Sequence, residues 1–164
     1  MNATFSGRAL GALCLALTVA SCATPGAEGR EVRARDMPQA QKGDVDAQYR
    51  VGRSYCCGSG IAYSTERAVA WLCRAAVKGH RDAMFELADI YAGDIGTTAK
   101  LLSMGRGHQD EIKAYMWYTA AMVQGRPKAE ARRAEVMRTL DDAELAEARR
   151  AATRWTQEKC PAVE

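Results

Sequence analysis

The sequence predicts an all-α fold, an α-hairpin solenoid of about two and a half repeats with a C-terminal helical cap. Three observations predict it. The segment GDVDAQYRVGRSY, which begins at Gly43, returns 36 residues later as GHRDAMFELADIY, which begins at Gly79. Apolar residues in each half of the unit recur at helical spacing, and glycines stand where the helices should end. A repeat of this length is typical of stacked helix pairs.

The first helix of each unit is predicted by apolar residues four positions apart. Ala47, Val51 and Tyr55 have this spacing in the first unit, and Ala83 and Tyr91 match two of them in the second. Side chains four residues apart lie on one face of an α-helix. Each segment therefore predicts one helix with a buried stripe.

The second helix of each unit also repeats. AVAWLCRAAVKG, which begins at Ala68, returns as AYMWYTAAMVQG, which begins at Ala114. The offset here is 46 residues, so the second unit carries a ten-residue insertion between its two helices. The alignment brings Trp71 into register with Trp117, which predicts core residues rather than a sugar-binding cleft.

Polar and glycine residues mark the ends of these second helices. Ser64 and Asp110 each stand four residues before the first aligned alanine, where an N-cap belongs. Gly79 and Gly125 follow the helices, where a left-handed C-cap conformation favours glycine. Residues 42–126 are thus predicted to form two helix pairs, with the insertion at 94–109.

The C-terminal segment, residues 127–160, predicts a third-repeat helix and a capping helix. Its first part is rich in alanine and arginine, and its second part, TLDDAELAEARRAATRW, has an aspartate pair suited to a helix start. Leu145, Ala148, Ala152 and Trp155 then share one face. We expect an α-hairpin that covers the last repeat, because a repeat array needs a cap with a polar outer face.

The N-terminus has the features of a secretory signal peptide at residues 1–21. Arg8 precedes ALGALCLALTVAS, an uncharged run too short to span a membrane comfortably. The run ends in VASC, which resembles the bacterial lipobox, and the resemblance implies that Cys22 is lipidated. An ordinary signal peptide and a soluble periplasmic protein are the alternative. We interpret residues 22–41 as the lipidated cysteine and a flexible tether.

The lipobox resemblance also implies a location in the cell. Ala23 stands where an aspartate would favour the inner membrane, so the periplasmic face of the outer membrane of the bacterial envelope is implied. Disulfides persist in such an oxidising compartment.

The cysteines of the predicted domain are Cys56, Cys57, Cys73 and Cys160. We expect a disulfide from Cys56 or Cys57 to Cys73, which lies on the next helix of the same hairpin. A closed loop of about 15 residues would contribute on the order of 3 kcal/mol. Cys160 is the other possible partner, although it lies beyond the cap. Of the three possible two-bridge schemes, we least expect the one with a Cys56–Cys57 bond, because a bridge between adjacent residues is strained.

No catalytic or metal-binding set emerges from the sequence. Cys56, Cys57, His80 and His108 make a poor zinc set, because adjacent cysteines lack the gap that lets two thiolates face one ion. A redox role is disfavoured because the cysteine pair ends a helix, where the dipole opposes a thiolate. The net charge of +3 with interspersed signs argues against nucleic-acid binding. We expect no enzyme activity, no metal and no cofactor.

The first unit carries a characteristic order of residues. Its first helix has an alanine, a glycine and a tyrosine, and a G-x-G turn follows. Its second helix has a cap residue, an A-x-x-W motif and two adjacent alanines, and a glycine follows it. These are Ala47, Gly52, Tyr55, Gly58, Gly60, Ser64, Ala68, Trp71, Ala75, Ala76 and Gly79. The arrangement resembles the Sel-one-like repeat (SLR), a relative of the tetratricopeptide repeat. Ser64 replaces the usual acidic cap, and Ala88 replaces the glycine in the second unit. The resemblance covers residues 43 to about 129.

The SLR resemblance implies a non-enzymatic adaptor or scaffold that binds an envelope protein or peptide. The contacts would come from the concave face and from the insertion, which offers a possible binding loop. Its candidate residues are Lys100, Met104, Arg106 and His108. A plain solvent loop is the alternative interpretation of the insertion.

A cell-wall factor that binds or modifies peptidoglycan, or binds β-lactams, is the competing hypothesis. It rests on the link between cysteine-rich SLR relatives and β-lactam binding, although the sequence has no S-x-x-K motif. A ligand-sized pocket beside the insertion would favour it.

Overall fold

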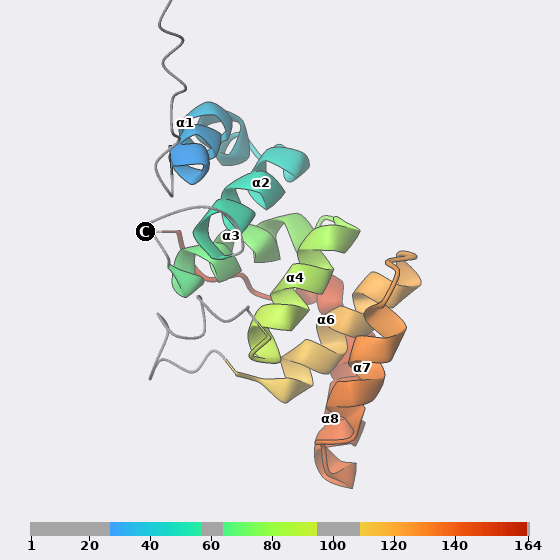
Figure 1. The fold of residues 1–164 in the computed structure, drawn as a ribbon. Helices are drawn as coiled ribbons and strands as arrows, with labels where there is room; N and C mark the ends of the chain where they lie inside the picture. Colours follow the sequence, from blue (N-terminus) through green and yellow to red (C-terminus); the bar gives the residue numbers. More distant parts are fainter. Residues whose placement is uncertain (1–26, 57–63, 95–108, 164) are drawn as a thin grey trace, which may run out of the picture.

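The computed structural model describes residues 27–56, 64–94 and 109–163. Within these ranges all regular structure is helical (Figure 1). The elements are α1 (Ala27–Gln41), α2 (Val45–Cys56), α3 (Thr65–Ala76), α4 (Arg81–Tyr91), α6 (Glu111–Val123), α7 (Ala129–Met137), α8 (Asp142–Ala152) and the 3-10 helix η1 (Trp155–Gln157). No helix of the described ranges is long and apolar enough to cross a membrane.

The helices pack in chain order, as expected for a solenoid. α1 packs on α2, α2 on α3, α3 on α4, and α4 on α6 (Figure 1). The pairs α2/α3 and α4/α6 are the two predicted hairpins. The predicted all-α solenoid is therefore confirmed.

The core is made of the residues that the repeat brings into register. Trp71 is 2% exposed and Trp117 is fully buried, which confirms them as core residues. At Gly52 an added Cβ would lie 2.8 Å from Leu72 Cγ and 3.0 Å from the Leu72 backbone nitrogen. These separations are too short for a methyl group. Glycine at this position thus allows α2 and α3 to approach closely.

Each hairpin is closed by the same hydrogen bond. The backbone N–H of Ser64 donates to the carbonyl of Tyr55 at 3.2 Å, and that of Asp110 donates to the carbonyl of Tyr91 at 2.9 Å. Ser64 and Asp110 also cap their helices through their side chains, as predicted. The chain therefore enters and leaves the insertion at one place, and the insertion does not alter the hairpin.

The predicted glycine helix ends are confirmed. Gly79 and Gly125 have φ of +94° and +75°, in the left-handed region that favours glycine. Gly43 has φ of +98° and the same pattern of backbone hydrogen bonds. Gly43 consequently ends a helix too, namely α1.

The prediction of a flexible tether over residues 22–41 is wrong for residues 27–41, which form α1. Residues 22–26 lie outside the described part. The segment has no apolar stripe and contains Pro38 in its last turns, so its own sequence gives little reason for a helix. The helix is instead stabilised by packing on α2.

Several contacts between α1 and α2 are polar. The buried carboxylate of Asp36 accepts from Arg50 Nε at 3.0 Å. Hydrogen bonds from Arg35 and Arg50 lower the pKa of Asp36 to about 2. Gln48 Nε2 donates to the carbonyl of Ala40 at 3.0 Å. Such contacts leave no periodic apolar signal in the sequence.

The C-terminal helices differ from the predicted hairpin. α7 and α8 each pack against α6 and barely contact each other. α8 begins with a capping box between Asp141 and Glu144, which accords with the predicted helix start. The two helices therefore cover α6 separately instead of forming a tight pair.

The disulfide prediction is also corrected. Cys73 of α3 pairs with Cys160, with their Cα atoms 5.5 Å apart, and not with Cys56 or Cys57. After α8 the chain turns back across α6, where Trp155 packs against Trp117 at a ring-centroid distance of 6.3 Å, and continues to α3.

Nearness within the hairpin does not decide the pairing, because the C-terminal tail returns to α3. Cys56 is buried at the end of α2 and is also disulfide-bonded. Cys57 lies outside the described residues.

We predict that Cys160→Ser lowers the free energy of unfolding by about 4 kcal/mol, because the bridge closes a long loop in the unfolded chain. The two cysteines are 87 residues apart. Urea unfolding of the oxidised protein measures the change, with Lys159→Ser at the exposed neighbouring position as the control. Equal stability of both variants would show that the bridge contributes nothing.

Candidate binding site

The candidate site begins as a row of aromatic and charged side chains on α2, on α4 and just after α6. Tyr49 of α2 and Phe85 of α4 occupy equivalent positions of the repeat and are both half-buried. Arg53 lies over the Tyr49 ring at 5.7 Å, and Arg126 lies over the Phe85 ring at 4.6 Å. We call these residues, with Asp82 and Glu86, the aromatic–arginine face.

Glu86 joins the two helices on this face. Its Oε1 accepts from the Tyr49 hydroxyl at 2.9 Å and pairs with Arg53 Nε at 3.0 Å. Burial raises the pKa of the Glu86 carboxyl, while Arg53 and the Tyr49 hydrogen bond lower it. His80, the N-cap of α4, stacks on Tyr49 with ring centroids 4.2 Å apart. The face is therefore well ordered around α4.

A second group of side chains continues from Phe85 toward α7. The ring of Phe85 meets that of Tyr118 edge-on at 5.5 Å. The Tyr118 hydroxyl donates to Asp89 Oδ1, and Arg132 of α7 approaches the same oxygen at 3.7 Å. Burial raises the pKa of Asp89, although the hydrogen bond from Tyr118 and the charge of Arg132 act to lower it. Burial also raises the pKa of Tyr118. This group connects α4, α6 and α7.

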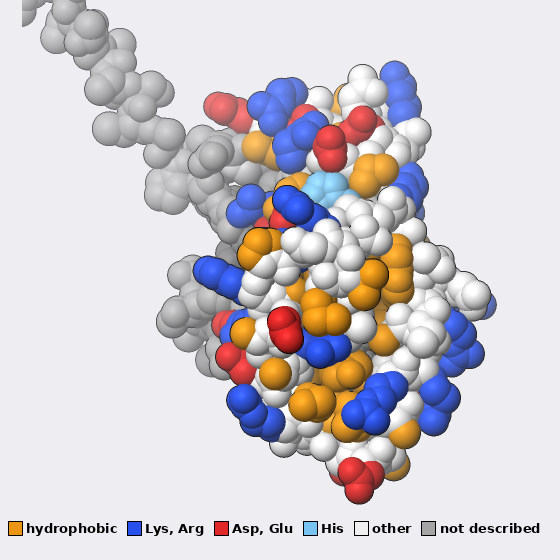
Figure 2. All heavy atoms as spheres, turned by 90° about the vertical axis from the view of Figure 1, so that its right-hand side faces the viewer, with side chains coloured by type: hydrophobic (Ala, Val, Ile, Leu, Met, Phe, Trp, Pro, Cys, Tyr) orange, Lys and Arg blue, Asp and Glu red, His pale blue; other side chains and the backbone are white. Residues whose placement is uncertain are grey.

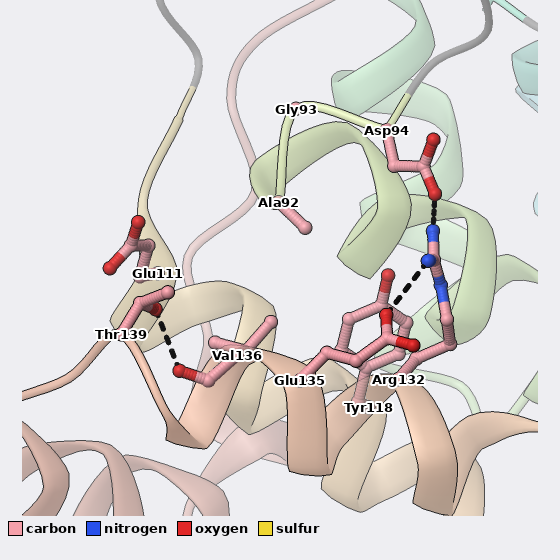
Figure 3. Close-up of a pocket in the computed structure, with 9 residues that line it drawn as sticks. All are labelled: Ala92, Gly93, Asp94, Glu111, Tyr118, Arg132, Glu135, Val136 and Thr139. Atoms are coloured by element: carbon pink, nitrogen blue, oxygen red, sulfur yellow. Dashed lines mark hydrogen bonds and ion pairs between the residues drawn. The ribbon is translucent and has the colours of Figure 1, made fainter.

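A pocket of about 320 Å³ opens beside this group, between α4, α6 and α7. Its lining residues are Ala92, Gly93, Asp94, Glu111, Tyr118, Arg132, Glu135, Val136 and Thr139 (Figure 3). Asp94 and Glu111 come from the two sides of the insertion, so the pocket lies at its base. Pockets that hold small ligands start at about this size.

Three of the four charged residues of the pocket, Asp94, Arg132 and Glu135, are gathered at one end (Figure 3). Arg132 forms an ion pair with Asp94 and another with Glu135 at 2.9 Å. In Figure 3 Glu111 and Thr139 lie on the other side, and Val136 lies between the two groups. The Thr139 hydroxyl donates to the Val136 carbonyl at 2.7 Å.

The structure does not describe most of the predicted site residues. Cys22 lies outside the described residues, and so do the four loop candidates Lys100, Met104, Arg106 and His108. His108 is also one of the residues considered and rejected as zinc ligands. In the described ranges no group of three or more His, Cys, Asp or Glu residues is arranged to hold a metal ion.

The residues that line the pocket are not among the site residues predicted from the sequence. Asp94 and Glu111 flank the insertion, and a search at its ends would have found them. Arg132 and Glu135 gave no such signal, because their helix comes after the second repeat and meets α4 only in the folded chain. The equivalence of Tyr49 and Phe85 was visible in the 36-residue register.

Comparison with known families agrees with the repeat register. The model for the Sel1 repeat matches residues 45–80 and 81–121. Two consecutive segments of the chain are thus similar to the Sel1 repeat. The second match is longer than the first because it includes the insertion. No curated protein sequence matches this chain.

A solved structure confirms the Sel1-type fold. The chain aligns with c5321, a protective antigen present in uropathogenic Escherichia coli strains that displays an SLR fold. The TM-score is 0.66 and the sequence identity is 21% over 82% of this chain. The alignment spans 27% of the antigen chain. At this identity the similarity establishes the fold and nothing about the ligand.

The aromatic–arginine face is linked to the pocket by the contacts from Phe85 to Tyr118 and from Asp89 to Arg132. Figure 2 shows a side of the molecule on which hydrophobic side chains gather in the lower half, between the side chains of Lys and Arg. A surface of this mixed kind suits a polypeptide with both apolar and charged groups.

We predict that Tyr118 and Asp89 are energetically coupled. Tyr118→Phe should destabilise the protein by about 1–3 kcal/mol, because a hydrogen bond to a half-buried carboxylate is lost. In an Asp89→Ala background most of this cost should disappear, since the acceptor is already gone. Urea unfolding of the four proteins in the cycle measures the coupling. Additive effects would contradict the contact.

Proposed function

We propose that this Sel1-repeat chain is a protein-binding scaffold without enzymatic activity, held at the bacterial cell envelope through a lipid on Cys22. The observation that carries the proposal is the aromatic–arginine face on two stacked Sel1 hairpins. Repeat arrays of this kind bind partners over an extended surface instead of in one deep site.

The chemistry of the face supports a peptide or protein partner. Tyr49 and Phe85 offer apolar area, and Arg53 offers donors close to them. The Arg53 side chain is 47% exposed although it is paired with Glu86. Aromatic residues and arginine are the types enriched in binding hot spots. The spacing of Tyr49 and Phe85 by one repeat provides two such anchors in a row.

The envelope location is supported by the N-terminal sequence and by the cysteines. The signal-like run and the VASC motif precede the domain. The Cys73–Cys160 bridge and the disulfide-bonded Cys56 are suited to an oxidising compartment. A lipid on Cys22 with at least two acyl chains would give stable anchoring.

The pocket favours one second candidate, a factor that binds a cell-wall fragment or a β-lactam. A ligand-sized pocket beside the insertion is the feature that would favour this alternative, and the pocket lies at the base of the insertion. The scaffold remains the preferred function because the pocket is only about 320 Å³ and the aromatic–arginine face extends beyond it.

Site-specific photo-crosslinking tests the scaffold. We expect a photoreactive amino acid at position 53 of the full chain to form covalent adducts with an envelope protein in living bacteria. The same amino acid at position 149, exposed on α8 and distant in the array, is the matched control and should give no such adduct. Mass spectrometry identifies the products.

The alternative has its own outcome in this experiment. If muropeptides co-purify with the chain and position 53 gives no protein adduct, the scaffold proposal is wrong and the cell-wall candidate is favoured. If positions 53 and 149 give the same adducts, the aromatic–arginine face is not the binding surface.

We predict that Cys22→Ser moves the protein from the membrane fraction to the soluble periplasmic fraction and abolishes incorporation of labelled palmitate. The acyl chains supply the membrane affinity, so the folded domain should be unaffected. Fractionation with Cys14→Ser as the control measures this. Unchanged membrane association of the Cys22→Ser protein would refute the lipid anchor.

A further inference from the structure

We propose that the pocket between α4, α6 and α7 accepts the cationic side chain of a lysine or arginine from the protein partner. The inference rests on the proposed scaffold function and specifies the chemistry of the partner at one point.

The lining carries more negative than positive charge. Asp94, Glu111 and Glu135 are carboxylates, and Arg132 is the single basic residue among the nine lining residues. Asp89 lies just beyond the lining and adds a further carboxylate near Arg132. A cavity lined mainly by one sign of charge attracts ligands of the opposite sign.

Arg132 is already neutralised and so does not offer an anion site. It pairs with Asp94, approaches Asp89 Oδ1 at 3.7 Å and contacts Glu135 Oε2 at 2.9 Å. An anionic ligand would have to displace one of these carboxylates and face the others. A cationic ligand would be attracted by these carboxylates and would leave some of the ion pairs of Arg132 intact.

Glu111 provides a carboxylate for the cation on the other side of the pocket. Within the described ranges it forms no ion pair, in contrast to Asp94 and Glu135. The positive end of α6 lies nearby, but Asp110 caps it by accepting from the Lys113 backbone N–H at 2.9 Å. The Lys113 ammonium in turn lies 3.9 Å from Asp110 and 3.6 Å from Glu158.

The space between the charged ends suits an aliphatic stem. Ala92, Val136 and the Tyr118 ring line the pocket between Glu111 and Arg132 (Figure 3). Lysine and arginine side chains bury their methylene groups against apolar surface and keep the charged head at polar groups. The described residues offer no clustered metal ligands, so an organic cation fits the lining better than a metal ion does.

Titration with Nα-acetyl-lysine methylamide, followed by the backbone amide NMR signals of Ala92, Glu111 and Thr139, tests the pocket. We expect saturable shifts at these residues. Acetylation of the probe's ε-amine should weaken binding about fivefold, and so should Glu111→Gln, because each removes one partly exposed charge pair. Glu147→Gln, at an exposed position on α8 outside the pocket, should leave binding unchanged.

Three results would overturn the proposal: no saturable shift, equal binding of the neutral probe, or an unchanged affinity of the Glu111→Gln protein. A lack of amine binding alongside a protein adduct at position 53 would reject the pocket and leave the scaffold. Saturable amine binding without any adduct would support the pocket and reject the scaffold.

Discussion

The burial of α6 is the constraint on which the rest of the molecule depends. This helix is buried on nearly all sides, with Tyr115, Met116, Trp117 and Tyr118 all shielded from water. A helix that is apolar all round needs neighbours on every side. α4 supplies one, α7 and α8 supply two more, and the returning tail with Trp155 covers what is left. The C-terminal third is thus best understood as the cover of α6.

The cover of α6 also creates the candidate site. Tyr118 belongs to α6, Asp89 to α4 and Arg132 to α7, and they meet only because the three helices pack together. The pocket is the space that remains between these three helices at the base of the insertion, where their side chains do not pack against one another. The same contacts therefore support the fold and define the charges that a partner would meet.

The repeat tolerates variation as long as its closing contacts remain. The carbonyl of Tyr55 accepts from Ser64 and that of Tyr91 from Asp110, although the second connection is ten residues longer. The loop entropy of a longer connection rises slowly with its length, so the added cost is small. Function can accordingly be varied in the insertion and at its base while the stacked hairpins stay the same.

The sequence by itself determined the helical repeat, its caps and its aromatic core, because these depend on spacing along one helix or on residues a few positions apart. Ser64, Asp110, Gly79 and Trp117 were all predicted in their roles. The tertiary structure decided helix α1, the Cys73–Cys160 bridge and the pocket. The physical reason is that each depends on contacts between segments whose nearness no local pattern encodes: polar pairs hold α1, and a tail that folds back brings Cys160 to α3.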